Sequence, residues 1–278
     1  MDLVLDAYDR FVLTPYLYPA SFESTDWRRQ LLSLVLITTI SGYVIYFSCS
    51  TFSYFFIFDR SLMKHPKFLK KQVRLEIQYA CQTIPFVATP TAAVFLLEVR
   101  GYSKLYYGVE DGTYGWLFIL FSTFTFVMFT DCLIYWIHRG LHSKLVYKHV
   151  HKQHHKWIVP TPFASYAIHP IDSFLQGVPY HIYPFLFPLN KLLYLTLFLF
   201  VNLWAVSIHD GNYHVPDLLK AYINGSAHHT DHHLYYNFNY GQFFTLWDHI
   251  GGSFKSPSAF EGKGPRDAVR RLLAAKDD

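Results

Sequence analysis

Long uncharged stretches alternate with short basic stretches along this chain, and the longest, residues 31–58, contains no charged side chain. A membrane-spanning helix needs about 20 apolar residues, so this segment is long enough to cross a bilayer with some tilt. Residues 79–98 form a second candidate span, with Pro85 and Pro90 inside it, and residues 116–137 form a third. Membrane helices tolerate internal prolines. The pattern therefore predicts an all-α integral membrane protein.

The apolar region 171–208 is interrupted by Pro179, Pro184, Pro188 and Asn190. We interpret it as a hairpin that turns near Pro188–Asn190, with two short arms. The chain is thus expected to contain about four membrane-spanning or hairpin helices.

Charge predicts the orientation of these spans. Residues 59–78 hold six Lys/Arg and two acids, whereas residues 1–30 hold three Lys/Arg and five acids. Residues 138–160 carry five Lys/Arg and no acid. Because basic loops stay in the cytosol, we expect 59–78 and 138–160 to be cytosolic, and the N-terminus and the loop 99–115 to be lumenal.

Histidines gather in three clusters that follow the spans. Of the 16 histidines, two form an HxxxH (His138, His142), three form an HxxHH (His151, His154, His155) and three form a second HxxHH (His229, His232, His233). On a helix, residues three and four positions apart share a face, so each cluster is expected to present its imidazoles together. Eight such ligands are too many for one ion and predict two adjacent metals. His209 and His228 are further candidate ligands, and His169 is a weaker one.

A shared metal site also explains why the fourth apolar region should be a hairpin. A single crossing would put the third cluster across the bilayer from the first two. We therefore predict one membrane-embedded domain over residues 1–278, with spans at about 31–58, 79–98 and 116–137 and a hairpin at 171–208. Its cytosolic, histidine-rich helical di-metal site would lie in 138–170 and 209–250.

Carboxylates near the clusters are expected to accept the second ring N–H of the ligands, as is common in metal sites. Asp172, Asp210 and Asp231 are candidates for this role. Asp131 is singled out as a candidate catalytic residue, because an acid inside a membrane span suggests a function and because it precedes His138 by two helical turns. Tyr166, Tyr180 and Trp204 are candidates for lining a substrate path.

Composition changes this picture little. The chain is 51% hydrophobic and 19% aromatic, and its net charge of +4 is too small to indicate nucleic-acid binding. Its cysteines, Cys49, Cys81 and Cys132, give no disulfide framework and no zinc-finger spacing. Imidazole ligands suit zinc, copper, iron and nickel alike, so ligand type does not select the metal.

The order HxxxH, HxxHH, HxxHH in a hydrophobic chain resembles the fatty acid hydroxylase superfamily of membrane di-iron enzymes. Two segments, SIHDGNYHVPDLL (207–219) and INGSAHHTDHHLYYNFNYGQFFTLWDHIGGSF (223–254), resemble its sterol C5-desaturase branch. The segments FTDCLIYWIHRGLH (129–142) and HKQHHKWIVPTPFASYAIHPID (151–172) carry the first two clusters.

This resemblance implies an O2-dependent desaturase that forms the C5–C6 double bond of a Δ7-sterol such as lathosterol, in sterol (cholesterol) biosynthesis. It implies two non-haem iron ions, electrons from NAD(P)H through cytochrome b5 and its reductase, and a place in the endoplasmic reticulum membrane with the site facing the cytosol. The alternatives are a lipid hydroxylase or methyl-sterol oxidase with the same clusters, a di-zinc membrane hydrolase and a metal transporter.

Overall fold

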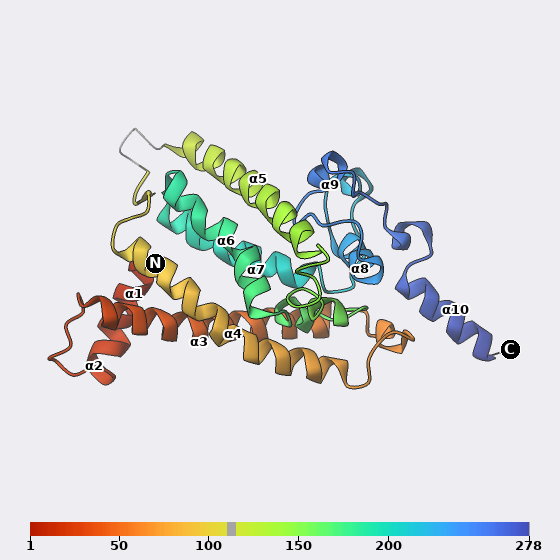
Figure 1. The fold of residues 1–278 in the computed structure, drawn as a ribbon, viewed down its shortest axis with the longest axis horizontal. Coiled ribbons are helices and arrows are strands. Elements are labelled where there is room, and N and C mark those ends of the chain that lie inside the picture. The colour runs from red at the N-terminus through yellow and green to blue at the C-terminus, as the bar shows by residue number, and fades with distance from the viewer. Residues whose placement is uncertain (110–114, 278) are drawn as a thin grey trace.

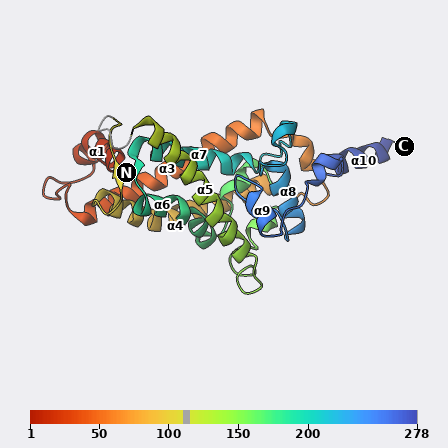
Figure 2. The same cartoon turned by 90° about the horizontal axis from the view of Figure 1, so that it is seen from above.

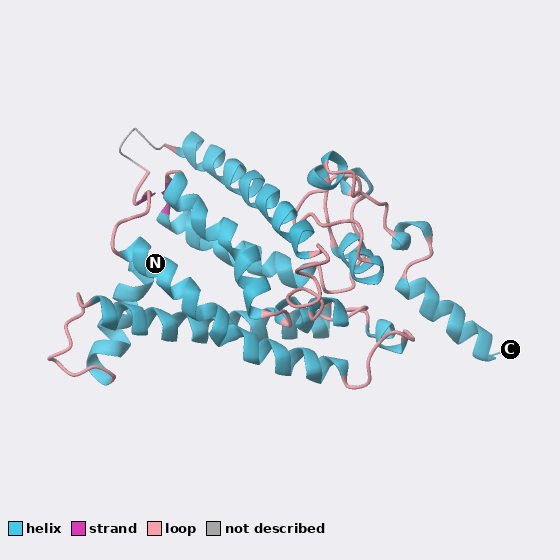
Figure 3. Ribbon diagram, viewed as in Figure 1, coloured by secondary structure: helices cyan, strands magenta, loops and turns pink. Residues whose placement is uncertain are grey.

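The computed structural model describes residues 1–109 and 115–277, which are mostly helical (Figure 3). The α-helices are α1 (Asp2–Tyr8), α2 (Thr14–Tyr16), α3 (Trp27–Phe56), α4 (Gln72–Val99), α5 (Trp116–Leu141), α6 (Pro170–Leu186), α7 (Lys191–Ser207), α8 (Ser226–Tyr235), α9 (Leu246–Ile250) and α10 (Pro265–Asp277). The segment η1 (Asp9–Leu13) forms a π-helical turn. The 3-10 turns are η2 (Arg60–Lys64), η3 (His154–Lys156), η4 (Pro162–Tyr166), η5 (Asp217–Leu219) and η6 (Ser258–Glu261). Two short parallel strands, β1 (Leu105–Tyr106) and β2 (Leu189–Asn190), pair with each other.

Three helices, α3, α4 and α5, are long and apolar enough to cross a membrane. Helices α4 and α5 contain the predicted spans 79–98 and 116–137 and extend beyond them, whereas α3 begins four residues before the predicted span 31–58 and ends two residues short of it, at Phe56. The start of α3 is fixed by Asp26, whose carboxylate accepts the backbone N–H of Arg28 at 2.8 Å. Helix α4 continues through Pro85 and Pro90, as expected for a membrane helix. The all-α membrane class predicted from the sequence is confirmed.

Helices α6 and α7 form the predicted hairpin. They run antiparallel, because His181 of α6 lies 3.2 Å from the Tyr194 hydroxyl near the start of α7. The side chain of Asn190 caps α7 by accepting the backbone N–H groups of Leu192 and Leu193. Pro179 and Pro184, which interrupt the apolar pattern, both lie inside the first arm of the hairpin, and α6 continues through them. Each proline removes only one backbone donor, and only the turn at 187–190 breaks the hairpin.

The five long helices pack around one apolar core. Figure 1 shows α3 and α4 side by side along one side of the molecule, α5 along the other, and α6 and α7 between them. The core contains Leu34, Phe95, Phe126, Tyr183 and Leu197, so all five helices contribute to it. Burial of these side chains fixes the positions of the helix ends, where the histidines lie.

The polar connections gather at the two ends of the helices. At one end, the backbone N–H of Lys104 donates to the Pro184 carbonyl at 2.7 Å, joining the loop after α4 to the hairpin turn. At the other end, Gln72 donates to the Val159 carbonyl at 2.9 Å, and Arg266 pairs with Asp59 at 2.8 Å. The segment after α3, the segment after α5 and the C-terminal third therefore share one end, as both views show (Figures 1 and 2).

Candidate metal centre

The first histidine cluster lies where α5 ends. His138 occupies the last turn of α5, and His142 follows as its C-cap residue. Arg139, between them, points away from the cluster and donates to the Tyr135 hydroxyl at 2.7 Å and to the Gly251 carbonyl at 2.6 Å. This arginine joins the end of α5 to the loop after α9.

The second and third clusters have different backbones. His151, His154 and His155 lie in a series of turns that ends in η3, so the expectation that this HxxHH forms on a regular α-helix was wrong. Turns still place residues 151 and 155 on one side of the chain. His229, His232 and His233 lie on α8, as expected, and all three are buried.

The structure brings nine histidines into two adjacent groups. His138, His142, His151, His155 and His232 form one group of five, and His154, His209, His229 and His233 form one of four. Within each group the candidate ligand nitrogens lie within 4.8 Å of one another. Each HxxHH gives its first and last histidines to one group and its middle histidine to the other. The two groups are therefore adjacent, because each HxxHH segment contributes histidines to both of them.

The protons on these imidazoles show that a cation fits the larger group. The Nδ1 of His138 donates to the Tyr240 carbonyl at 2.9 Å, and the Nδ1 of His151 donates to Asp172 at 2.6 Å. A neutral imidazole has only one N–H, so the Nε2 atoms of both rings carry lone pairs. Yet these Nε2 atoms face each other at 3.2 Å. Two facing lone pairs repel unless a cation lies between them.

The same argument applies to the other ligands of the two groups. His232 donates from Nδ1 to the Phe238 carbonyl at 2.8 Å, and His209 donates to the Ala205 carbonyl at 2.6 Å. The Nε2 of His209 then faces the Nε2 of His229 at 3.0 Å. Outer hydrogen bonds of this kind fix the ring orientation of metal ligands.

Burial favours the neutral form of His154, His155, His209 and His229. It is the main cause that lowers the pKa of His209 to about 4, and it lowers the pKa values of His154, His155 and His229 well below the ordinary value. For the last three, neighbouring histidines add to the effect, since a second positive charge in the cluster is unfavourable. Neutral imidazole is the form that binds a metal.

One of the four candidate carboxylates contacts a ligand. Asp172, fully buried, accepts from His151, as expected for the outer partner of a ligand. Asp210 accepts the backbone N–H of Asn212 at 2.7 Å, and Asp231 accepts from Ser258. These two acids hold the surrounding loops and do not hydrogen-bond to a ligand in the described residues.

Asp131 does not contact a clustered histidine through any described hydrogen bond. Its carboxylate accepts backbone N–H groups of the loop after α8, from Phe243 at 2.7 Å and Gln242 at 3.2 Å. The structure thus gives it the position of a cap for this loop, unlike the catalytic position suggested by the sequence. The loop also contains Tyr240, whose carbonyl orients His138.

His209 joins the group of four, whereas His228 and His169 lie outside both groups. The ring of His228 packs against Phe254 and Phe260 on the far side of α8, because it is one residue out of phase with the HxxHH. His169 caps α6 by accepting the backbone N–H of Ile171. The proposal that His228 is a ligand therefore has no support from its position.

A cavity of about 380 Å³ lies between α3, α4, α6 and α7 and reaches ligands of both groups. Its wall includes Ile37, Ala88 and Leu199 along the helices. At one end it contacts four candidate ligands, His138, His154, His209 and His229. Volumes of 300–1,000 Å³ are typical of ligand-binding pockets. The cavity thus offers a mostly apolar molecule access to the metal centre.

Two of the three aromatic residues proposed for a substrate path line this cavity. Tyr166 and Tyr180 line the cavity, whereas the indole of Trp204 donates to the Gln242 carbonyl at 2.7 Å and is not among the lining residues. Sequence reasoning missed Gln176, which lines the cavity and donates to Asp172 at 2.7 Å. A polar residue one helical turn after Asp172, in an apolar helix, was the available signal.

Comparison with known proteins places these features in a family. The fatty acid hydroxylase family pattern matches residues 123–253, which include all the candidate ligands. Lathosterol oxidase of Mus musculus is 57% identical over 98% of this chain and 91% of its own length, and that of Homo sapiens is 56% identical over 99% and 92%. A Delta(7)-sterol 5(6)-desaturase of Leptosphaeria maculans is 53% identical over 87% of this chain and 67% of its own. No solved structure gives a significant match.

Proposed function

The chain belongs to the fatty acid hydroxylase family, among its lathosterol oxidases and Δ7-sterol 5(6)-desaturases, and we propose that it forms the C5–C6 double bond of a Δ7-sterol such as lathosterol. This reaction belongs to sterol biosynthesis. The observation that carries the proposal is the apolar cavity that ends on histidines of both groups, in a chain so similar to enzymes of that name.

The two histidine groups would hold two iron ions. The group of five and the group of four contain only imidazole donors, which suit iron among other metals. Iron, when bound, supplies the redox chemistry that removes hydrogen from an unactivated C–H bond. The protein holds the ligand rings in place through Asp172 and the carbonyls of Tyr240, Phe238 and Ala205.

The position of the double bond sets the direction of the sterol in the cavity. C5 belongs to the ring that carries the 3-hydroxyl, so this ring must lie at the end with His138 and His154. Gln176 lines the cavity, and its amide nitrogen is held by Asp172, which leaves its carbonyl oxygen free to accept a hydroxyl proton. The sterol side chain then extends toward Phe95 and Ile37, away from the metals.

The proposed reaction balances with an external electron donor. Removal of one hydrogen from C5 and one from C6 yields two electrons and two protons, whereas reduction of O2 to two water molecules consumes four of each. Two further electrons and two protons must therefore enter in each turnover. We assign their supply to NAD(P)H through cytochrome b5 and its reductase.

The proposed location is the endoplasmic reticulum membrane, in several passes, with the metal centre facing the cytosol. Three apolar helices support the membrane assignment. The end of the molecule that carries the histidines also carries the basic segments 59–78 and 138–160, which supports the cytosolic orientation.

The test uses membranes from yeast cells that lack their own sterol C5-desaturase and express this chain. Supplied with lathosterol, O2 and NADH, they should form a conjugated Δ5,7-diene, detected by its ultraviolet absorption and by a mass two hydrogens lower. Membranes without O2 are the control. An alcohol product would support the hydroxylase alternative, and O2-independent hydrolysis would support a di-zinc enzyme.

A further inference from the structure

A second cleft reaches the candidate metal centre through a different histidine from those that line the sterol cavity. It has a volume of about 460 Å³ and is lined by residues of the turns after α5, by His169 and by Tyr236. His155 lines this cleft, although it does not line the sterol cavity. The group of five histidines can therefore be approached from two sides, with a different ligand nearest on each.

The cleft is positively charged. Lys148, Lys152 and Lys156 line it, and all three side chains are exposed. None of them forms an ion pair with a described residue, and residues 138–160 contain no acid that could neutralise them. Three unpaired lysines around a recessed surface attract a partner with acidic side chains.

Aromatic rings connect the cleft surface to the metal ligand. The Tyr236 ring lies 4.9 Å from the His155 ring, and the Tyr147 ring lies 5.8 Å from it. The Nε2 of His155 lies 3.1 Å from those of both His142 and His151, so its ring extends from the cleft into the group of five. About the width of one aromatic ring thus separates the surface of the cleft from a candidate metal ligand.

We propose that this cleft is the docking site of an acidic one-electron carrier protein, which delivers electrons to the metal centre through His155. The inference rests on the proposed function, which requires two external electrons per turnover. Each docking event transfers one electron from the reduced carrier to the metal centre and releases the oxidised carrier, so two docking events serve one turnover. Sterol and electrons then reach the centre by separate routes.

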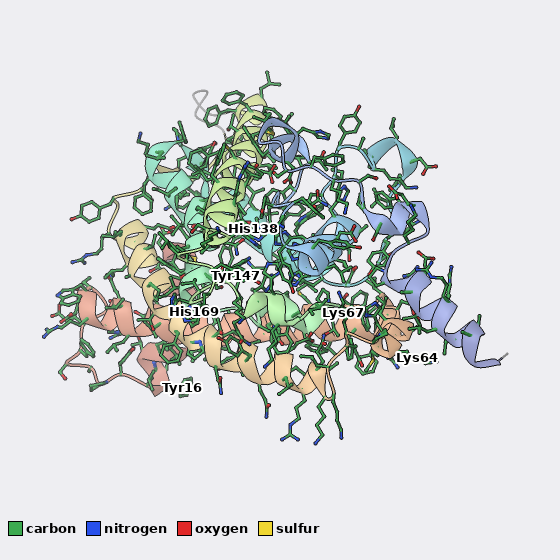
Figure 4. The ribbon with its side chains drawn as sticks, turned by 45° about the vertical axis from the view of Figure 1, so that its right-hand side comes forward. Tyr16, Lys64, Lys67, His138, Tyr147 and His169 are labelled. Atoms are coloured by element: carbon green, nitrogen blue, oxygen red, sulfur yellow. The ribbon has the colours of Figure 1, made fainter. Side chains whose placement is uncertain are left out.

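The charge in the cleft is tested with the triple variant Lys148→Glu, Lys152→Glu, Lys156→Glu. Its matched control is Lys64→Glu, Lys67→Glu, Lys70→Glu, which reverses three exposed charges at the same end of the molecule. Figure 4 shows Lys64 and Lys67 apart from Tyr147 and His169 of the cleft. Both variants change the net charge equally, so a difference between them reports on position.

Purified enzyme in neutral-lipid nanodiscs is reduced by the soluble domain of cytochrome b5. The cleft variant should raise the KM for this carrier by about tenfold or more at low salt, and added salt should raise the KM of the wild-type enzyme toward the same value. The control variant should keep the wild-type KM. Equal effects of the two variants, or no effect of either, would overturn the proposal.

A second measurement separates this proposal from the proposed function. Enzyme reduced beforehand with dithionite needs no carrier, so a single turnover with lathosterol and O2 measures the metal centre alone. Diene formation in this assay, together with an unchanged KM for the carrier in the cleft variant, overturns the docking site and leaves the desaturase function standing. No diene from wild-type enzyme overturns the function itself.

If the cleft variant instead alters only binding to vesicles with phosphatidylserine, the face contacts the membrane and the docking proposal fails.

Discussion

Single histidine substitutions distinguish the two groups of ligands. His151 belongs to the group of five and His233 to the group of four, and both side chains are fully buried. His151→Ala and His233→Ala should each abolish sterol conversion and lower the iron content by about one ion per chain, because each removes a ligand from a different ion. The protein should still insert into membranes, since insertion depends on the apolar helices.

His228→Ala is the matched control, because His228 is also buried on α8 but belongs to neither group. It should retain both iron ions, measured by elemental analysis, and should still convert sterol. Loss of iron from His228→Ala, or full activity of His151→Ala, would contradict the two-group arrangement.

Asp172→Asn tests the outer partner of a ligand. The carboxylate accepts from His151 at 2.6 Å and from Gln176 at 2.7 Å. An amide of the same shape is a weaker acceptor for the His151 N–H, so we expect a loss of about 10- to 100-fold in iron affinity or activity. Asp231→Asn is the control, since Asp231 holds Ser258 and no ligand. Equal losses in both variants would indicate a general folding defect.

The histidines that come together were largely predictable from the sequence, but their division into two groups was not. The spacing of the clusters identified eight of the nine grouped histidines, and His209 was a further candidate. Spacing does not show that His154 and its neighbour His155 belong to different groups. That division depends on how the turns before η3 meet α8, which involves contacts far apart in the chain.

At the level of elements, the structure depends on loops held by buried acids. Asp131 of α5 accepts backbone N–H groups of Phe243 and Gln242, and Asp248 of α9 accepts those of Tyr240 and Gly241. The loop between α8 and α9 is thus fixed by acids at both of its sides. Sequence patterns predict helices from local periodicity, whereas this loop has none, so its geometry was not predictable.

Asp131→Ala should loosen this loop. It leaves buried backbone N–H donors without an acceptor, which should lower the free energy of unfolding by about 1–3 kcal/mol. It should also make the Tyr240 carbonyl, which orients His138, less firmly positioned. We expect a shorter half-life at elevated temperature and easier loss of iron. Asp131→Asn retains an acceptor oxygen and should show a smaller effect on both. If Asp131→Asn instead eliminates activity while iron content and half-life stay at wild-type values, the acid takes part in the chemistry.

At the level of the whole molecule, the hairpin of α6 and α7 decides whether the metal centre can form. Its turn lies beside the loop after α4, at the end opposite the histidines, where Lys104 contacts Leu186. The chain therefore returns to the end where α5 stopped, and α8 can meet the first two clusters. The need for a shared metal site predicted this turn correctly, because three clusters separated by a bilayer cannot bind the same ions.

The orientation of the molecule in its membrane is tested with glycosylation probes. The natural sequon at Asn224 is a poor probe, because Asn224 is 1% exposed and its side chain bonds the Gly241 carbonyl, so a sugar on this side chain would itself prevent the fold. We therefore place lengthened sequons in two exposed segments, 19–25 and 64–67, which lie at opposite ends of the molecule. Sugar is added only in the lumen. Protein with the probe at 19–25 should therefore migrate more slowly on a gel, and treatment with a glycosidase should reverse this shift. Protein with the probe at 64–67 should show no such shift. Each variant must still form the diene, which shows that the metal centre has assembled. Sugar at 64–67 in an active variant would place the histidines in the lumen, where the basic cleft could not meet a cytosolic electron carrier.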